Sequence, residues 1–409
     1  MANMPQFSHA SDHFLPRKTG TNSFDCYNIP SMDIKEILRQ VQIKEGWIRD
    51  TLRELVQQES PSEDRPAVNA AMGLAERWAR EQRARVKRHR QREFGDVLEL
   101  RFGPSRSSSK PVLLLGHLDT VWPIGTLEKM PWREADGRYW GPGVLDMKAG
   151  VVMALAALNT LQDMKLSRPV TLLLNSEEEV GSPISRAITE RLALESAAVL
   201  VLEPAQGLAY KTARKGVGHY NVQVTGVGAH SGVDFERGHS AVLELAKLVQ
   251  AISNFTNLTR KLTVNCGVIA GGTRSNVVAS SAHAEVDVRI AKASDASHVE
   301  KLFRGLKVSD PQCKLTITGG INRPPMERKA GTIALFKKAR ALAAELGFAL
   351  EEAATGGGSD GNFTAALGVP TLDGMGAVGD GAHATHESVV IEHLVPRTAL
   401  LAAMIASVD

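Results

Sequence analysis

Three short apolar runs in this chain each end at polar side chains that could bind a metal ion. The run 112–115 leads into Gly116-His117-Leu118-Asp119, the run 170–174 into Glu177-Glu178-Glu179, and the run 198–202 into Glu203. Because no cysteine lies among them, these imidazole and carboxylate groups suit borderline cations such as zinc, cobalt or manganese. Neighbouring carboxylates could then divide two tasks, one binding the ion and another taking a proton from water.

The pair His117 and Asp119 has the spacing of a histidine and its carboxylate partner. Alternate side chains of an extended segment point the same way, so the carboxylate could accept a hydrogen bond from the second ring N–H of the histidine. For this pair taken alone, a hydrogen-bonded histidine at the end of a strand, with no metal, is the alternative interpretation.

The three adjacent carboxylates Glu177-Glu178-Glu179 can also be interpreted in two ways. On a solvated surface such an acidic run would be unremarkable. At the mouth of a buried sheet the same charges require a compensating positive charge, which a divalent ion supplies. Glu203 ends the third apolar run and is held by the following Pro204, so it is a further candidate oxygen ligand.

Two more candidates lie in glycine-rich loops. The segment Gly141-Pro142-Gly143 leads to Asp146 just before a predicted helix, where the alternative role is to cap that helix. Near the C-terminus, His383 and His386 follow the glycine-rich segment 374–381 and compete for one role. The coincidence of all these residues at strand ends and loops of one predicted domain favours a shared metal site.

The elements that must position these residues alternate between helix and strand. Helical periodicity over 32–58, 67–83 and 148–162, between the apolar strands, predicts an α/β domain with a mostly parallel sheet. Ligands of such sheets bind beyond the carboxyl ends of the strands. After residue 323 the pattern resumes with a helix over 332–346, a tight loop over 356–360, a short strand over 369–371 and a terminal helix over 392–407.

A different pattern occupies the middle of the chain. A strand over 219–225, a helix over 240–255, strands over 262–270 and 282–290, a helix over 296–306 and a strand over 313–318 predict a ferredoxin-like βαββαβ unit. The proline-rich segment 322–325 predicts an inter-domain hinge. We therefore predict a loosely ordered arm over 1–30, an α/β domain made of 31–213 and 324–409, and an inserted domain over 214–323.

Composition excludes several other classes of protein. The 409 residues carry a net charge of only +3 and 5% aromatics, which argues against nucleic-acid and membrane partners. The basic run 80–92 is expected at a solvated helix-to-strand edge. The separated Cys26, Cys266 and Cys313 predict buried free thiols. With no signal-peptide pattern at the N-terminus and no stretch long enough to cross a bilayer, we expect a cytoplasmic protein.

The motifs resemble those of the co-catalytic di-zinc metallopeptidases. Gly116-His117-Leu118-Asp119-Thr120-Val121, the segment from Gly141 to Lys148, Glu177–Ser182 and Glu203-Pro204 occur in the order typical of that family, which includes bacterial glutamate carboxypeptidases, succinyl-diaminopimelate desuccinylase, acetylornithine deacetylase and aminoacylase. The resemblance covers nearly the whole chain after the N-terminal arm. It implies a catalytic α/β domain with an inserted domain that serves as lid and dimer interface.

The resemblance also implies a role for each candidate. Asp146 would bridge two zinc ions, for which cobalt or manganese could substitute. His117 and Glu203 would complete one ion, and Glu179 and His383 the other. His383 is preferred to His386 because the family's histidine stands a few residues before a glutamate, and Glu387 follows His383 at the matching position. Glu178 would be the general base and Asp119 the partner of His117.

In the inserted domain, three residues are implied to act at the active site. His230 would reach the site of the partner subunit in a homodimer and stabilise the oxyanion. Asn276 and Arg289 would bind a substrate carboxylate, and Gly358, from the α/β domain, would border the pocket. From the residues alone, His230 could be an ordinary loop histidine and Arg289 part of a cross-strand ion pair.

These roles imply hydrolysis of an amide bond next to a free carboxylate. The overall likeness to glutamate carboxypeptidases predicts release of a C-terminal glutamate from a peptide or an N-acyl-glutamate. An aminoacylase or N-acetyl amino-acid deacetylase is the alternative. A non-catalytic binding protein on the same fold would be expected to have lost ligands, whereas every ligand position here is filled.

Overall fold

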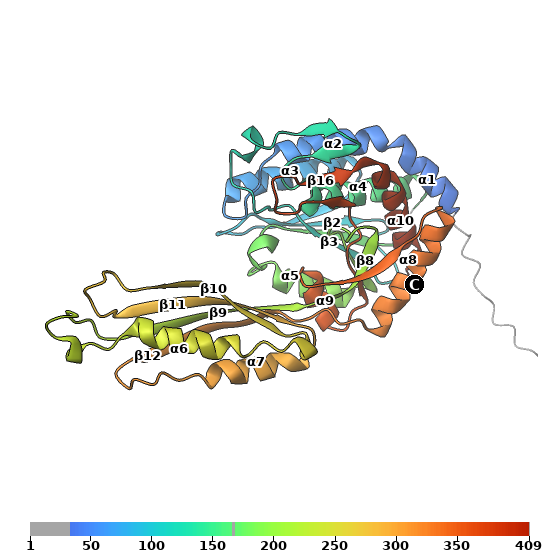
Figure 1. Ribbon diagram of the computed structural model, residues 1–409. Helices are drawn as coiled ribbons and strands as arrows, with labels where there is room; N and C mark the ends of the chain where they lie inside the picture. Colours follow the sequence, from blue (N-terminus) through green and yellow to red (C-terminus); the bar gives the residue numbers. More distant parts are fainter. Residues whose placement is uncertain (1–32, 166–167, 409) are drawn as a thin grey trace, which may run out of the picture. The chain divides into compact units, whose positions relative to one another are not determined.

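The computed structural model describes residues 33–165 and 168–408, so the predicted arm over 1–30 lies outside the described residues. Residues 33–409 form one compact unit. Its central feature is a six-stranded sheet (Figure 1). The strand order is β1 (Arg85–His89), β2 (Val97–Phe102), β6 (Val170–Asn175), β3 (Val112–His117), β7 (Ala198–Val201) and β14 (Thr371–Leu372).

The last four strands of this order run parallel, which confirms the predicted mostly parallel sheet. The strands β1 and β2 run antiparallel at one edge, and β1 contains part of the basic run 80–92. Neighbouring residues of β3 enter two different cores: Val112 and Leu114 one, Leu113 and Leu115 the other. Burial on both faces explains why these strands are continuous apolar runs rather than alternating ones.

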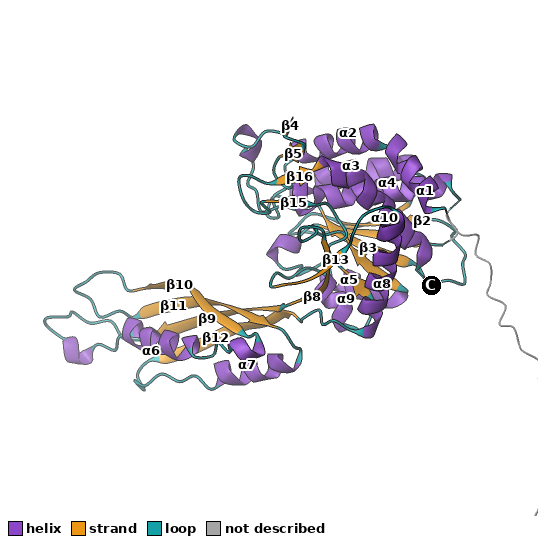
Figure 2. Ribbon diagram, turned by 45° about the vertical axis from the view of Figure 1, so that its right-hand side comes forward, coloured by secondary structure: helices purple, strands orange, loops and turns teal. Residues whose placement is uncertain are grey.

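Helices cover both faces of the six-stranded sheet (Figure 2). The larger core receives side chains from α1, α2, α3, α4, α8 and α10, and the smaller core from α5. The short α9 contacts α5, β7 and β14. The bounds are α1 (Ile34–Ile43), α2 (Glu45–Gln57), α3 (Arg65–Glu81), α4 (Ala149–Asp163), α5 (Arg186–Glu195), α8 (Ala330–Glu345), α9 (Gly361–Ala366) and α10 (Leu394–Ser407).

Two sequence predictions need correction in this region. The single helix expected over 32–58 is two helices, because Lys44 leaves helical geometry with φ −92° and ψ 2°. Both helices bury their apolar faces in the same core, so the periodicity continues across the break. In addition, the helical segment Val144–Asp163 is long and apolar enough to cross a membrane, contrary to the expectation of no such stretch; 89% of its most apolar part is buried in the fold, which is typical of a core helix.

A second, antiparallel sheet is inserted between β8 and the return of the chain to the α/β part. Its strand order is β10 (Thr263–Gly271), β11 (Ser281–Ile290), β9 (Gly216–Thr225) and β12 (Lys314–Arg323). Helices α6 (Ala241–Ser253) and α7 (Ser294–Arg304) lie on one face of this sheet (Figure 1). Along the chain the order is β9-α6-β10-β11-α7-β12, as the predicted βαββαβ pattern requires.

Two smaller sheets lie beside the main one. Strand β8 (Ala209–Arg214) pairs in parallel with β13 (Glu351–Thr355) and leads into β9 after Lys215 alone. The two connections to the inserted sheet are joined by backbone hydrogen bonds between Arg214 and Met326. The other small sheet has the order β15 (Gly379–Asp380), β16 (Ser388–Val390), β5 (Arg138–Trp140) and β4 (Arg133–Ala135). Cys313 is buried and free as predicted, Cys266 is free but only half-buried, and Cys26 lies outside the described residues.

Candidate metal centre

The centre is built where β3 ends. His117 is the last residue of β3, and its side chain is almost fully buried. Its Nε2 lies 3.3 Å from Asp146 Oδ1 and 3.7 Å from Glu203 Oε1. Residues from three separate segments therefore meet at the carboxyl end of the parallel strands, as the strand-end pattern predicts.

Asp146 lies between two histidines. While Oδ1 faces His117, the other carboxylate oxygen, Oδ2, lies 3.3 Å from Nε2 of His383. The same His383 nitrogen lies 3.3 Å from Glu179 Oε2. The competing His386 makes no ion pair with a carboxylate in the described part of the chain, so the geometry brings His383 into the cluster. Each oxygen of Asp146 thus faces a different histidine.

The donor set fits divalent cations. The ligand atoms of His117, Asp146 and Glu179 lie within 4.8 Å of one another, and so do those of His117, Glu178 and Glu203. Three of these atoms, His117 Nε2, Asp146 Oδ1 and Glu179 Oε1, are buried and have no hydrogen-bond partner. A buried polar atom without a partner costs about 1–3 kcal/mol, and metal binding at this cluster would give each of the three a partner.

The charges of the cluster also call for a cation. Burial raises the pKa of Glu178 to about 8 and the pKa of both Glu179 and Glu203 to about 7. Hydrogen bonds to Asp146 and Glu179 raise the pKa of His383 to about 10. The raised pKa values reflect mainly the cost of carrying a carboxylate charge in this buried space, a cost that a divalent ion bound beside these groups would offset.

Asp119 contacts His117 on one side of the cluster and the backbone of Glu178 and Glu179 on the other. Nδ1 of His117 lies 3.0 Å from the backbone oxygen of Asp119 and 3.4 Å from its carboxylate, so the backbone oxygen is the nearer acceptor. The carboxylate itself accepts hydrogen bonds from the backbone N–H groups of Glu178 and Glu179, each at 3.1 Å. With a proton on Nδ1, the lone pair of His117 Nε2 is available to a metal.

Glu387 fixes the loop that carries Asp146. Its buried carboxylate accepts backbone hydrogen bonds from Gly143 at 2.8 Å, Leu145 at 2.8 Å and Asp146 at 3.0 Å. It also accepts one from the indole N–H of Trp122 at 2.8 Å. Sequence reasoning used Glu387 only to choose between two histidines. The structure adds that it holds the candidate bridging ligand in place.

Arg323, the last residue of β12, contacts Glu178. Its Nη2 donates to Glu178 Oε1 at 2.7 Å and to Asp360 Oδ1 at 3.0 Å, and the side chain is only 6% exposed. Sequence reasoning missed this arginine because it lies in the segment interpreted as a hinge. The one available signal was an arginine directly before Pro324-Pro325, at the predicted junction of the inserted domain.

Two cationic side chains, Arg214 and Lys211, lie near Glu203. Arg214 forms a buried double ion pair with Asp373, with distances of 2.8 and 2.6 Å, and its Nη2 lies 3.8 Å from Glu203 Oε2. Lys211 is only 9% exposed, yet its ammonium makes no hydrogen bond or ion pair with any described residue. Burial and the charge of Arg214 lower the pKa of Lys211, whereas Glu203 and Asp146 act in the opposite direction.

Glu177 does not face the ligand cluster. Its buried carboxylate accepts hydrogen bonds from the backbone N–H of Ser185 at 2.6 Å and from the hydroxyl of Ser176 at 2.6 Å. It thereby fixes the turn between β6 and α5.

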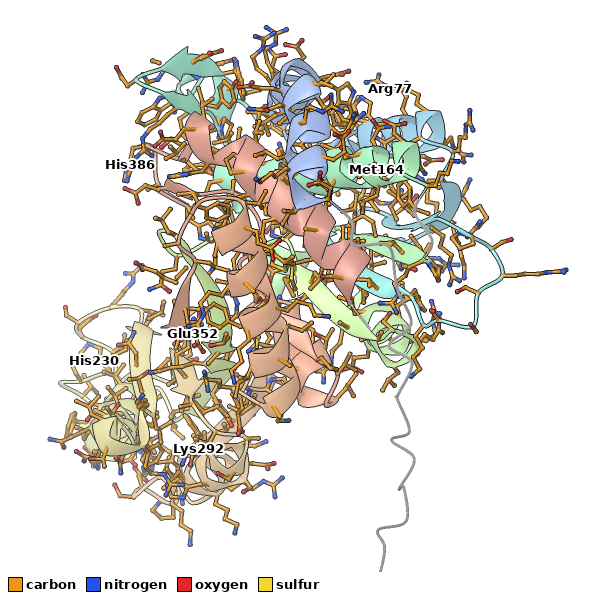
Figure 3. All side chains as sticks on the ribbon, turned by 90° about the vertical axis from the view of Figure 1, so that its right-hand side faces the viewer. Arg77, Met164, His230, Lys292, Glu352 and His386 are labelled. Carbon is orange, nitrogen blue, oxygen red and sulfur yellow. The ribbon has the colours of Figure 1, made fainter. Side chains whose placement is uncertain are left out.

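His230 and Asn276 lie away from the cluster. Both are exposed, and their segments are adjacent, because Ser231 N–H donates to the Asn276 oxygen at 3.0 Å. Figure 3 shows His230 on the inserted part of the chain and His386 in the C-terminal loop, well separated. Among the described residues, His230 contacts none of the ligand candidates. Within one subunit the structure therefore does not bring His230 to the centre.

Arg289 and Gly358 occupy the region between the two sheets. Arg289 pairs with Asp287 through Nε at 2.8 Å and Nη2 at 2.8 Å, which is an ion pair along one strand rather than across two. The oxygen of Gly358 accepts from Arg214 Nη1 at 3.0 Å. A Cβ at Gly358 would lie 3.0 Å from Arg323 Cδ, so the missing side chain lets the backbone approach that arginine.

Comparisons with known proteins agree with this arrangement. Residues 113–407 match the profile of peptidase family M20/M25/M40. Carboxypeptidase G2 of Pseudomonas sp. (strain RS-16) is 31% identical over 303 residues, which span 72% of each chain. Acetylornithine deacetylase of Myxococcus xanthus is 28% identical over 325 residues, 74% of this chain and 82% of the relative.

Solved structures show the same fold. A tripeptidase of Staphylococcus aureus superposes with a TM-score of 0.76 at 20% identity, covering 89% of this chain and 98% of that one. A metallo-carboxypeptidase of family M20 from Sulfolobus solfataricus gives a TM-score of 0.71 at 17% identity, covering 88% and 98%.

Proposed function

Since this chain belongs to the peptidase family M20/M25/M40 and is a metallopeptidase, we propose that it releases a C-terminal glutamate, or a similar acidic residue, from a peptide or an N-acyl amino acid. The observation that carries the acidic specificity is the side chain of Lys211, which is only 9% exposed and makes no hydrogen bond or ion pair with any described residue. The likeness to carboxypeptidase G2 supports cleavage at a C-terminal residue.

We propose that two divalent ions, most simply zinc, occupy the centre. His117 and Glu203 would hold one ion, Glu179 and His383 would hold the other, and Asp146 would contribute to both sites. The opposite orientation of the two Asp146 oxygens, each 3.3 Å from a different histidine, supports this division. When bound, the ions supply Lewis-acid chemistry: they polarise the amide carbonyl and lower the pKa of the attacking water.

Glu178 moves the proton in this proposal. Its carboxylate takes a proton from the attacking water as the oxygen bonds to the carbonyl carbon, and returns it to the amine as the C–N bond breaks. Asp119 fixes the backbone of Glu178, and Arg323 fixes one of its carboxylate oxygens. The other oxygen of Glu178 remains for the proton transfer.

Substrate recognition falls to cations near the centre. A side-chain carboxylate of the leaving residue would pair with Lys211, whose ammonium has no partner among the described residues. The free α-carboxylate would be held by Arg289 and by Asn276; because Asn276 lies beside His230, away from the centre of its own subunit, it would reach the site from the partner subunit. For Arg289 this requires exchange of its ion pair with Asp287, a partly exposed contact on the strand.

The role of His230 requires a second subunit. The inserted part offers the exposed edge strand β10, with Val268 and Ile269 46% and 57% exposed, and the exposed Leu243 of α6 beside it. We propose a homodimer through this face, in which His230 of each chain steadies the oxyanion at the other centre.

Mixing two inactive variants tests this exchange. In a heterodimer of Glu178→Gln and His230→Ala chains, one centre keeps its own Glu178 and receives an intact His230. Random mixing after unfolding and refolding should therefore restore about a quarter of wild-type activity, since half of the dimers would each hold one complete centre. If His230 serves its own chain, no mixture regains activity.

Hydrolysis of a substrate panel tests the specificity. The zinc-loaded enzyme would be given an N-acyl-glutamate, a peptide ending in glutamate, an N-acyl-methionine, an N-acetyl neutral amino acid and N-acetylornithine, with and without chelator. We expect chelator-sensitive release of glutamate that is lost in Glu178→Gln. Lys211→Met should lower kcat/KM for the N-acyl-glutamate about 100-fold and leave the N-acyl-methionine within about threefold. The exposed Lys129→Met is the matched control.

The same substrate panel also distinguishes the alternative functions. Activity confined to the acetylated neutral amino acid or to N-acetylornithine would assign the chain to the deacetylases, in line with its likeness to acetylornithine deacetylase. A preference for glutamate that survives Lys211→Met would contradict the role of that lysine while leaving the centre as proposed.

A further inference from the structure

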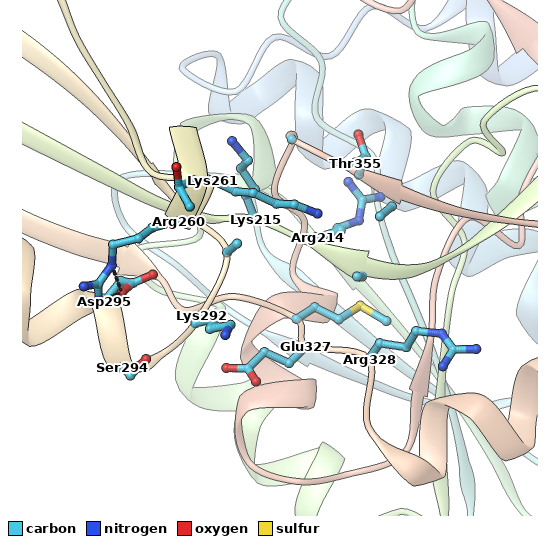
Figure 4. Close-up of a pocket in the computed structure, with 16 residues that line it drawn as sticks. Arg214, Lys215, Arg260, Lys261, Lys292, Ser294, Asp295, Glu327, Arg328 and Thr355 are labelled. Carbon is cyan, nitrogen blue, oxygen red and sulfur yellow. Dashed lines mark hydrogen bonds and ion pairs between the residues drawn. The ribbon is translucent and has the colours of Figure 1, made fainter. Parts of the chain in front are cut away.

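A cavity of about 790 Å³ lies where the inserted sheet joins the α/β part. No candidate ligand of the metal centre lines it. Figure 4 shows its lining residues, which come from chain segments far apart in the sequence. These segments are the β8–β9 junction at 213–215, the turn 259–261, residues 291–295 at the start of α7, the linker 326–328 and the end of β13 at 354–356.

The arginines that line this cavity all have carboxylate partners. Arg214 pairs with Asp373, Arg260 with Asp295, and Arg328 with Glu352. The dashed line in Figure 4 marks the contact between Arg260 and Asp295. These three cations are offset within the protein, so they add little net charge to the cavity.

The lysines that line the cavity are different. Lys215, Lys261 and Lys292 make no side-chain hydrogen bond or ion pair in the described part of the chain. The remaining acidic residue, Glu327, accepts a hydrogen bond from the backbone N–H of Ala293 at 2.8 Å. Three lysines against one carboxylate leave two positive charges in excess within a concave space.

Asp295 adds an independent feature. It lines the cavity and is only 1% exposed. One carboxylate oxygen binds Arg260, but the other, Oδ2, is buried without a hydrogen-bond partner. An acceptor left in this way is satisfied when a ligand brings a hydroxyl or ammonium donor to it.

From these observations we propose that the cavity binds a small polyanion that carries at least two negative charges and a hydrogen-bond donor. The charges pair with Lys215, Lys261 and Lys292, and the donor binds Asp295 Oδ2. The volume suits a ligand of metabolite size. Two sources share this chemistry: a phosphate ester with free hydroxyls, and a short acidic peptide with its terminal ammonium.

Calorimetric titration of the zinc-loaded, full-length enzyme tests the proposal. The probes are glucose 1,6-bisphosphate, tri-glutamate amide, whose blocked C-terminal carboxyl excludes it as a substrate of the proposed activity, and, as a singly charged control, acetate. The test variant is Lys261→Gln/Lys292→Gln, two exposed positions at which folding should not suffer. The matched control is Lys129→Gln/Lys337→Gln, which removes the same charge from exposed positions elsewhere.

We expect wild type and the control variant to bind at least one polyanion with one site per chain and to ignore acetate. The test variant should bind that probe about tenfold more weakly or worse. Binding of the phosphate ester alone or of the peptide alone would support the site and identify its source. No binding of either probe to wild type at millimolar concentration would overturn the proposal. So would equal loss of affinity in both variants, which would indicate only diffuse attraction to net charge.

Discussion

The strongest structural prediction concerns Glu387, which holds the Asp146 loop without contacting the proposed metal or substrate. Four N–H groups donate to its carboxylate, two to each oxygen: Leu145 and Asp146 to Oε1, Gly143 and Trp122 to Oε2. In Glu387→Gln, one oxygen remains to accept from one pair. The new NH₂ group faces N–H donors of the other pair, so two hydrogen bonds are lost and donors oppose donors.

The magnitude follows from the bonds lost. A hydrogen bond to a charged group contributes about 1.5–3 kcal/mol, so the loss of two should lower the free energy of unfolding by about 3 kcal/mol or more. Because Asp146 N–H is one of the four donors, its carboxylate should also shift. Loss of a group that orients a metal ligand typically weakens metal binding about 10- to 100-fold.

Two assays would measure these effects. Urea denaturation gives the unfolding midpoint, and competition with a chromophoric chelator gives zinc affinity. Glu392→Gln is the matched control, because Glu392 lies five residues on and its side chain is 79% exposed. Glu387→Asp, which keeps the charge on a shorter side chain, should be intermediate. A Glu387→Gln enzyme with wild-type zinc affinity and midpoint would refute the reasoning.

Three other variants test further parts of the structure. His383→Ala should lower kcat/KM at least about 100-fold, whereas His386→Ala should stay within about threefold, as only His383 contacts Asp146 and Glu179. Gly358→Ala should lower kcat about tenfold, because the new Cβ would lie 2.8 Å from Val217 and 3.0 Å from Arg323; Gly357→Ala, with 3.9 Å of clearance, should not. Hydrogen bonds from Lys247 and Ser309 lower the pKa of Glu244 to about 2, although its burial acts in the opposite direction. The ionised carboxylate therefore stabilises the fold fully above its ordinary pKa of about 4.5, and this stabilisation is lost as the pH falls toward 2. Glu244→Gln should therefore cost about 2 kcal/mol at pH 7 in urea denaturation, and the difference from wild type should narrow below pH 4.5, whereas the exposed Glu236→Gln should show neither effect.

The sequence predicted which side chains meet at the candidate metal centre, because the fold brings strand ends together. His117, Glu179 and Glu203 each follow an apolar run, and parallel strands bring such ends to one edge of the sheet. Local pattern was enough for these residues, since each apolar run marks both the strand and the residue at its end. Asp146 and His383 depended more on the family likeness, because a loop position carries no comparable periodic signal.

The supporting residues could not be found in the same way. Arg323 meets Glu178 across 145 positions of sequence, and Glu387 meets the N–H of Asp146 across 241. Local hydrophobic periodicity does not predict either contact, because the paired residues lie far apart in the sequence. The basic run 80–92 was expected at a solvated helix-to-strand edge, and the structure places the end of α3 and the partly exposed edge strand β1 there. The neighbouring strand β2 was not predicted, because Glu99 and Arg101 interrupt its apolar residues.

The acidic triplet shows how adjacent residues of one kind acquire different tasks. Glu177 turns into the protein and binds Ser185, and Glu178 contacts Arg323, while Glu179 faces His383. The 3-10 turn at 178–180 separates their directions, and Asp119 holds that turn through two backbone N–H groups. Composition predicted that these carboxylates would divide their labour. Which residue takes which task depends on partners that fold against the turn from β12, from the start of α5 and from the C-terminal loop, and therefore only on tertiary structure.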